Sequence, residues 1–364
     1  MLKALGFEIV ERRDVHPIVQ VIIVIFGLIV AFAVSGWVIS LTGNDPVESF
    51  TVMFKGAFGE QRKIWTTLMR SSPLLLTALA TVITFRAQIW SIGQEGQLFA
   101  GAMLAYALYR FIGGTGPSMP RPLFLTLIVL TGFFGGALLG WLAGWLRTRF
   151  NVDIIISTVL LNYIIITMLQ FLLYDHKYWM DPKSFYPRSA IIPKEDWYPI
   201  LVAGSKLHMG FLIAIGLAIL TYWILKKTPY GFDLRALGAN PVATQFKGID
   251  VNKLILVTMF LSGGLAGLAG VGELFGVHHN VNLDISPGYG YTGIIIAMLA
   301  ELHPLFVILV AIFFGGLING SIILITSTGV HTSIVFVIQA LVLIAVLVSR
   351  ALMKYRIRRI HHAN

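Results

Sequence analysis

Five polar side chains stand at breaks in long apolar segments or inside such segments. They are Gln94, Glu95, Gln97, Asn162 and Glu273. A carboxylate or amide at membrane depth needs hydrogen-bonding partners, so such residues either bind one another or line a path for a polar solute. The first three lie at the start of an apolar run and are flanked by glycines, which predicts a broken helix beside a substrate path.

Two of these residues also have a structural interpretation. Glu95 stands where a carboxylate would cap the start of a helix at the membrane interface, which the helix dipole favours. Asn162 lies in the middle of an apolar run, where an amide commonly forms a hydrogen bond to a neighbouring helix. Both alternatives stay open at the level of the sequence.

Residue patterns that carry catalysis are missing. The sequence holds no hydrolase nucleophile elbow, no dinucleotide fingerprint and no pair of catalytic carboxylates. It also holds no Gly-Lys dipeptide, and therefore no Walker A loop for ATP. His278 and His279 are adjacent and point in different directions, as do His361 and His362, which disfavours a metal site. We therefore expect neither enzyme activity nor a metal or cofactor in this chain.

The elements that position these residues are predicted to be membrane helices. The chain has 364 residues, of which 57% are hydrophobic and 12% are charged, and its mean hydropathy is +0.81. Repeated apolar segments of about 20 residues fit spanning helices, whereas barrel strands are roughly half as long. The prediction is an all-α polytopic membrane protein with nine or ten spans, hence about 10 transmembrane helices. The absence of cysteine excludes disulfides and thiolate metal sites.

The net charge of +10 is explained better by a membrane than by nucleic acid. Basic residues beside spans set the orientation and contact anionic lipid. Their density predicts that residues 1–17 and the basic tail 351–364 are cytoplasmic and flank a single transmembrane domain over 18–350. The same orientation places a polar interval, 227–253, on the cytoplasmic side.

This polar interval carries the signals of a short helix. Asn240 is a good N-cap, Pro241 suits the first helical position, and Gly248 can close the far end. The prediction is a helix from Pro241 to Lys247. Val242 and Phe246 lie one turn apart on one face of it, and an apolar face outside the membrane asks for a partner. The alternative is that this face packs back on its own bundle.

Glycine and alanine recur at helical spacing in two predicted spans, at 135–145 and 262–273. Small residues let helix backbones approach closely, so both stretches predict tight helix packing. Two further glycine-interrupted stretches, 92–96 and 288–293, occupy corresponding places in the two halves of the chain. Interrupted segments of this kind are typical of an inverted repeat with a path at the membrane midplane.

A transporter needs an energy source, and the carboxylates indicate which kind. Coupling to an ion gradient usually requires carboxylates well inside spans. Glu95, Glu273 and Glu301 all fall at predicted ends or breaks, which favours a separate ATPase docked on the short helix. A gradient-driven secondary carrier is the alternative from another class, and it requires Glu95 or Glu273 to be essential.

Three runs of the sequence resemble, in order and spacing, the permease subunits of bacterial ABC importers for nucleosides and simple sugars. They are SIGQEGQLFAGA from Ser91, YGFDLRALGANPVATQFKGIDV from Tyr230 and SGGLAGLAG from Ser262. These permeases belong to the branched-chain amino acid and ribose permease group, and the resemblance covers about 68–347. The chain departs from the family pattern at 290–302, a segment expected to line the path.

The resemblance implies a type II ABC permease fold with an inverted repeat in the bacterial cytoplasmic (inner) membrane. It also implies a second permease subunit, expected to be a different chain, and an extracytoplasmic substrate-binding protein. An ATP-binding subunit would hold ATP and Mg. The expected solute is a nucleoside, with a simple sugar such as ribose as the alternative. The residues assigned to docking on the ATPase are Arg235, Leu237, Gly238, Asn240, Pro241, Val242, Ala243, Thr244 and Phe246.

Overall fold

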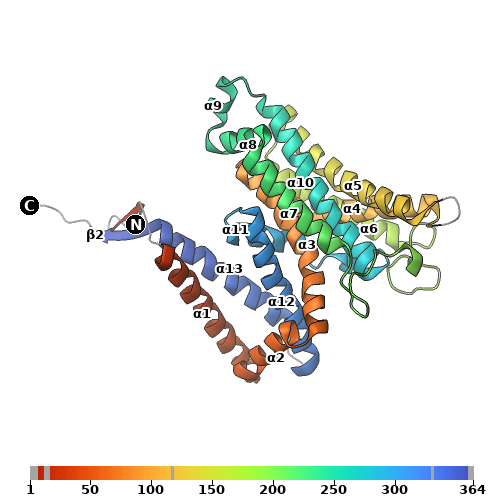
Figure 1. Ribbon diagram of the computed structural model, residues 1–364, viewed down its shortest axis with the longest axis horizontal. Helices are drawn as coiled ribbons and strands as arrows, with labels where there is room; N and C mark the ends of the chain where they lie inside the picture. Colours follow the sequence, from red (N-terminus) through yellow and green to blue (C-terminus); the bar gives the residue numbers. More distant parts are fainter. Residues whose placement is uncertain (1–6, 12–16, 116–118, 329–331, 360–364) are drawn as a thin grey trace, which may run out of the picture. The chain divides into compact units, whose positions relative to one another are not determined.

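The computed structural model describes residues 7–11, 17–115, 119–328 and 332–359 (Figure 1). Almost all regular structure is helical. The helices are α1 (Pro17–Leu41), α2 (Pro46–Phe58), α3 (Gln61–Arg86), α4 (Gln94–Ile112), α5 (Arg121–Phe150), α6 (Ile154–Tyr174), α7 (Gly210–Lys227), α8 (Pro229–Ala239), α9 (Pro241–Phe246), α10 (Val251–Glu273), α11 (Tyr289–Leu299), α12 (Pro304–Thr328) and α13 (Thr332–Lys354). Two short strands, β1 (Phe7–Glu11) and β2 (Tyr355–Arg359), complete the regular elements.

Six of the described helices are long and apolar enough to cross a membrane. They are α3, α5, α6, α7, α10 with the π-helical turn that follows it, and α12. A bent pair made of most of α1 and α2 raises the number to seven if it counts as one span. The chain is therefore an integral membrane protein of helical type, and the expected count of about ten spans stays a prediction.

The chain divides into two compact units, and the division falls inside α12 between Gly316 and Leu317. The first unit holds residues 1–59 and 317–364. In it, α1 packs along α13, and the Ser349 hydroxyl donates to the Ile23 carbonyl at 3.2 Å. Strands β1 and β2 pair antiparallel, with Ile9 opposite Ile357.

The second unit, residues 60–316, is built around the contact between α5 and α10. Glycines bring the two backbones together: a Cβ atom added to Gly136 would lie 2.1 Å from the Gly263 carbonyl oxygen. The same holds one turn away, where a Cβ on Gly267 would lie 2.3 Å from the Gly132 carbonyl oxygen. The predicted tight packing of both small-residue stretches is confirmed, and the two stretches prove to be each other's partners.

Helix α3 extends further than the sequence indicates. The apolar run from about Pro73 to Phe85 predicts a short span, whereas the helix begins at Gln61. Basic residues in its first half lower the local hydropathy, and Pro73 looks like a helix start. Inside the helix Pro73 is buried, and the Thr77 hydroxyl donates to its carbonyl at 2.9 Å.

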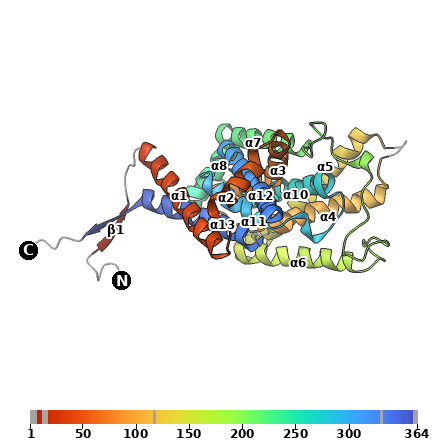
Figure 2. The same ribbon diagram turned by 90° about the horizontal axis from the view of Figure 1, so that it is seen from below.

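The ends of the second unit differ in character. Helices α8 and α9 lie at one end, and the long connection 175–209 lies at the other (Figure 1). Helix α6 runs along one edge beside α4 (Figure 2). The candidate path residues therefore lie between an end that carries the polar interval 227–253 and an end that carries the long connection.

Candidate functional site

Two helix starts meet inside the second unit. Helix α4 begins at Gln94 after the non-helical connection 87–93, and α11 begins at Tyr289. The Glu95 carboxylate accepts a hydrogen bond of 2.7 Å from the backbone N–H of Gly290. A Cβ atom on Gly290 would lie 2.3 Å from the Glu95 nitrogen, so only glycine fits this crossing. The two glycine-interrupted stretches noted in the sequence thus lie against each other.

Side chains from other elements satisfy the free N–H groups at these two helix starts. The side-chain amide oxygen of Asn162, on α6, accepts from the Gly96 N–H at 2.9 Å. The side-chain amide nitrogen of Asn162 donates to the Ile92 carbonyl at 2.8 Å. The Ser286 hydroxyl accepts from the Tyr289 N–H at 3.0 Å. Since the first N–H groups of any helix lack intrahelical partners, these bonds allow both starts to be buried.

This geometry bears on both structural alternatives. Asn162 hydrogen-bonds between helices, as its structural interpretation holds. Glu95 caps a helix start, but the capped helix is α11 and the carboxylate is only 3% exposed rather than interfacial. A carboxylate at this position also interacts favourably with the α11 dipole.

Two glutamines beside this junction keep free polar atoms. Both amide atoms of Gln94 and the amide oxygen of Gln97 are buried without a hydrogen-bond partner among the described residues. Gln94 is fully buried and Gln97 is 1% exposed. Buried polar atoms without partners are uncommon, and water or a ligand commonly supplies the missing bonds at such places.

Glu273 lies at the end of α10 in a neighbouring polar cluster. Its carboxylate is 3.6 Å from the His278 Nε2 atom and close enough to Arg70 to interact with its charge. Arg70 also lies beside the Tyr289 hydroxyl, and its Nε atom has no described partner. Tyr289 therefore connects the Glu273 cluster with the α11 start.

Sequence reasoning missed Arg70 and Tyr289 as members of this site. An arginine inside a span that is otherwise apolar was the available signal, because charged residues there face the bundle interior. This signal was hidden because the predicted span began at about Pro73, which left Arg70 outside it. Tyr289 gave no signal of its own, since tyrosine is common in membrane proteins.

Two histidines outside the spans are held neutral. Burial and the nearby His279 lower the pKa of His208 to about 4, and burial lowers the pKa of His279 to about 4. The His208 Nδ1 atom accepts from the Gly210 N–H at 3.1 Å. The His279 ring stacks on Trp197 with 3.5 Å between ring centroids. Both rings act as packing groups at neutral pH.

The polar interval 227–253 contains two helices where the sequence predicted one. Helix α8 precedes the expected α9 and is anchored on the bundle: Leu237 is 3% exposed, and the Arg235 guanidinium donates to the Leu225 carbonyl. Gly238 lies so close to the Arg86 carbonyl that a Cβ would be 2.2 Å from its oxygen. These three residues hold the interval in place. The missed signal was Thr228 before Pro229, the same cap and first-turn pattern as Asn240 before Pro241.

Helix α9 presents the apolar face. The Asn240 side chain caps it by accepting from the Ala243 N–H at 3.0 Å, and Pro241 occupies its first turn. Val242 is 62% exposed and Phe246 is 88% exposed, while Thr244 is buried. The face therefore does not pack back on its own bundle within the described chain.

A polar cavity of about 570 Å³ opens beside this interval. The start of α9, the connection between α5 and α6, and the residues that follow α3 line it. Its cationic side chains are Arg147 and Arg149, both exposed. The exposed α9 face and this cavity together form a surface with apolar and basic parts.

Comparison with known proteins shows relatives along nearly the whole chain. Residues 63–347 match the family described as branched-chain amino acid transport system / permease component. The guanosine ABC transporter permease protein NupP of Bacillus subtilis is 30% identical over 346 residues, which are 94% of this chain and 96% of that protein. The glucose ABC transporter permease protein of Haloferax volcanii is 28% identical over 92% of this chain and 88% of its own length. A further guanosine ABC transporter permease protein of Bacillus subtilis, NupQ, is 30% identical over 68% of this chain and 78% of its own length.

Proposed function

The chain belongs to the family of branched-chain amino acid transport system permease components, and from this premise we propose that it carries a nucleoside as one subunit of an ABC importer. It is an integral membrane protein and a transport subunit, not an enzyme. The full-length match to a guanosine permease supports a nucleoside as the solute. The match to a glucose permease supports a simple sugar as the second candidate.

The observation that carries the nucleoside proposal is the set of three free amide atoms at the α4 start, two on Gln94 and one on Gln97. Gln94 and Gln97 offer donors and acceptors without net charge, in a buried place where two short helix starts meet. A nucleoside carries complementary groups on its base and ribose. The Glu95 carboxylate is already engaged by Gly290, so a cation is not required there. Glu95, Asn162 and Glu273 are assigned to the walls of the path.

The energy source in this proposal is a separate ATPase that holds ATP and Mg and contacts α9. Val242 and Phe246 would bind it, supported on the interval that α8 anchors. Closure of the ATPase would pull α9 together with α10. Glycines bring the backbones of α10 and α5 into direct contact, so α10 and α5 would move as one body.

The remaining parts of the assembly follow from the family. A second permease completes the path, and the match to both NupP and NupQ of one organism supports a different chain in that role. An extracytoplasmic protein delivers the solute. The chain would span the cytoplasmic membrane about ten times as an inverted repeat, with both termini and residues 227–253 in the cytoplasm. The meeting of the α4 and α11 starts supports this repeat.

Uptake of labelled guanosine and ribose into proteoliposomes that hold the whole importer tests the solute. We expect ATP-dependent guanosine uptake that falls at least tenfold in Gln94→Leu, because the leucine cannot supply the lost bonds. Ribose uptake that exceeds guanosine uptake would favour the sugar alternative. Uptake that collapses with an uncoupler while ATP is maintained would replace the ATPase proposal with a gradient-driven carrier.

Binding of the ATPase tests the docking face. Phe246→Asp should abolish co-purification of the ATPase, because it places a charge in an apolar contact. Phe185→Asp is the matched control, since Phe185 is fully exposed on the connection at the opposite end. Equal retention of the ATPase by both variants would exclude α9 as the docking helix.

A further inference from the structure

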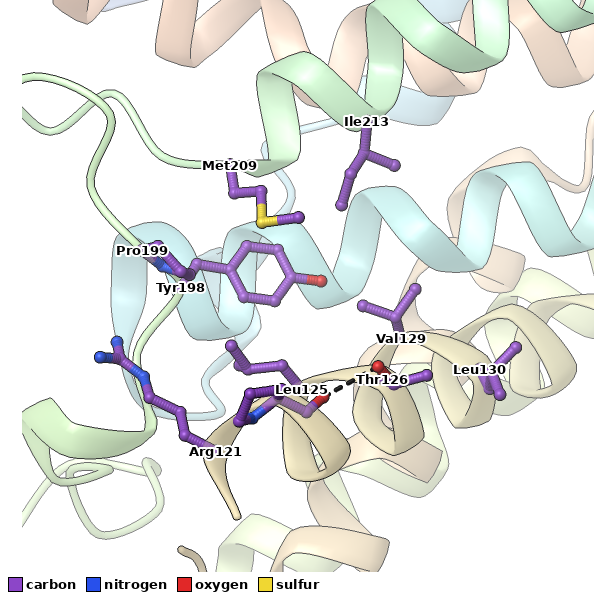
Figure 3. Close-up of a pocket in the computed structure, with 10 residues that line it drawn as sticks. Arg121, Leu125, Thr126, Val129, Leu130, Tyr198, Pro199, Met209 and Ile213 are labelled. Carbon is purple, nitrogen blue, oxygen red and sulfur yellow. Dashed lines mark hydrogen bonds between the residues drawn. The ribbon is translucent and has the colours of Figure 1, made fainter.

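A groove of about 510 Å³ lies between the starts of α5 and α7 (Figure 3). Its walls are mainly apolar side chains: Leu125, Val129 and Leu130 on α5, and Met209 and Ile213 at α7. Both helices are candidate spans, and they begin at the end of the unit opposite α8 and α9. Leu130 and Met209 are both exposed, so the groove is open on the outer side of two candidate spans, at the end of the unit opposite α9.

Three lining residues, Arg121, Thr126 and Tyr198, carry polar side-chain atoms, and the first two already make a hydrogen bond within the chain. The Thr126 hydroxyl donates to the Pro122 carbonyl at 2.8 Å. Tyr198 is 5% exposed, and its hydroxyl points into the space between α5 and α7 (Figure 3). No described residue hydrogen-bonds to this hydroxyl. A nine-tenths-buried phenol that faces an apolar groove without a partner calls for a ligand with an acceptor at that depth.

Arg121 stands at the outer end of the groove. One of its guanidinium nitrogens donates to the Trp197 carbonyl at 3.0 Å, which fixes the side chain. A guanidinium has five N–H donors, so others remain for an anion, and Arg121 is exposed. Phosphate is the anion that this fork geometry suits best at a membrane surface.

The groove is preformed by backbone bonds. The Tyr198 N–H donates to the Phe275 carbonyl at 3.0 Å, and the Met209 N–H donates to the Pro199 carbonyl at 2.9 Å. These bonds tie the loop that carries Tyr198 to the end of α10 and to the start of α7. Burial raises the pKa of the Tyr198 hydroxyl, so it stays a donor at neutral pH. A fixed groove binds its ligand without an ordering cost.

We propose that this groove binds a membrane phospholipid, with the phosphate on Arg121, an ester oxygen on the Tyr198 hydroxyl and one acyl chain along Val129, Leu130 and Ile213. The order of cation, free hydroxyl and apolar wall along the groove is the order of phosphate, ester and acyl chain in the lipid. An apolar helix of a partner protein would leave both the cation and the hydroxyl without a function. The lipid belongs to the leaflet opposite the docking helix.

Native mass spectrometry of the full chain, purified free of lipid and titrated with dioleoyl phosphatidylglycerol, tests this site. Arg121→Gln should weaken the tightest-bound lipid about tenfold or more, because it removes a charge-assisted bond. Tyr198→Phe should weaken it several-fold without disturbing the ring packing, because it removes one neutral hydrogen bond. Val129→Trp should abolish it by filling the groove.

Arg149→Gln is the matched control, since it removes the same charge at the opposite end of the unit and should leave this lipid bound. Equal weakening by Arg121→Gln and Arg149→Gln would show general attraction to anionic lipid and overturn the site. The proposal also fails if Val129→Trp keeps the lipid but loses the second permease, because the groove would then be a protein interface. Tyr198→Phe is conservative enough to fold, so its result stands even if Val129→Trp does not fold.

Discussion

Gln94 and Asn162 are buried amides a few ångströms from the same helix start, yet their surroundings differ. Asn162 has partners on both amide atoms, whereas Gln94 has none among the described residues. A buried amide with hydrogen-bond partners stabilises the fold, whereas a buried amide without partners is available to bind a ligand. Asn162 therefore stabilises the junction that forms a wall of the proposed path, whereas Gln94 is assigned to binding the solute.

Asn162→Leu should lower the free energy of unfolding by about 1–3 kcal/mol, because it leaves the Gly96 N–H and the Ile92 carbonyl buried without partners. Gln94→Leu is the matched control and should not lower it, since no bond is lost and a buried amide without partners is removed. Thermal or urea unfolding in one detergent measures both. A larger loss in Gln94→Leu would show that its amide is bonded in the protein.

His208 should make the protein acid-sensitive. Its pKa is about 4 in the folded chain and 6.5 when unperturbed, so the folded state binds fewer protons between these values. Its contribution to stability is complete above about pH 6.5 and is lost as pH falls toward about 4. Melting temperatures measured from pH 7.5 to 4 should fall less in His208→Gln than in the native chain. His176→Gln, at an exposed position, should reproduce the native curve.

At the scale of elements, the crossing of α4 and α11 depends on one missing side chain. Gly290→Ala places a Cβ within 2.3 Å of the Glu95 backbone nitrogen, so the helices must separate. We expect a loss of about 1–3 kcal/mol in stability together with a loss of uptake. Gly216→Ala on α7 meets nothing within 4 Å and should stabilise the protein by several tenths of a kcal/mol. If both variants unfold alike, the close crossing is not present in solution.

The helices whose boundaries are marked by local chemistry were predictable. Helix α9 was found because a cap, a first-turn proline and a closing glycine act over a few residues. The start of α3 was not, because its first turns are polar, with Gln61 and Arg62 exposed, and so carry no apolar signal of a span. Helix α8 was missed although Thr228 and Pro229 signalled it.

The candidate site was predictable only as a set of residue types. Glu95, Gln94 and Gln97 were recognised from polarity within an apolar run. The hydrogen bond between Glu95 and Gly290 links positions 195 residues apart, and no spacing rule predicts such a contact. Arg70 and Tyr289 entered the site only through that long-range packing.

At the scale of the whole molecule, the orientation in the membrane is the decisive test. The native chain has no cysteine, so a single introduced thiol gives an unambiguous label. Gln245→Cys, on α9, should react only with reagents that reach the cytoplasmic side. Phe185→Cys, on the long connection, should react with an impermeant maleimide added to whole cells. The opposite labelling pattern would invert the proposed topology.

The glycine contact between α5 and α10 also bears on how the chain is made. Residues 151–250 separate the two helices, so α5 leaves the ribosome well before its partner exists. At roughly 5–20 residues per second, α5 waits for about 5–20 s with its glycine face uncovered by α10. Ribosome-bound chains truncated before Val251 should therefore crosslink from this face to insertion factors, and longer chains should not. The close contact between α5 and α10 is thus formed late in synthesis, and the glycine face of α5 can bind other proteins until then.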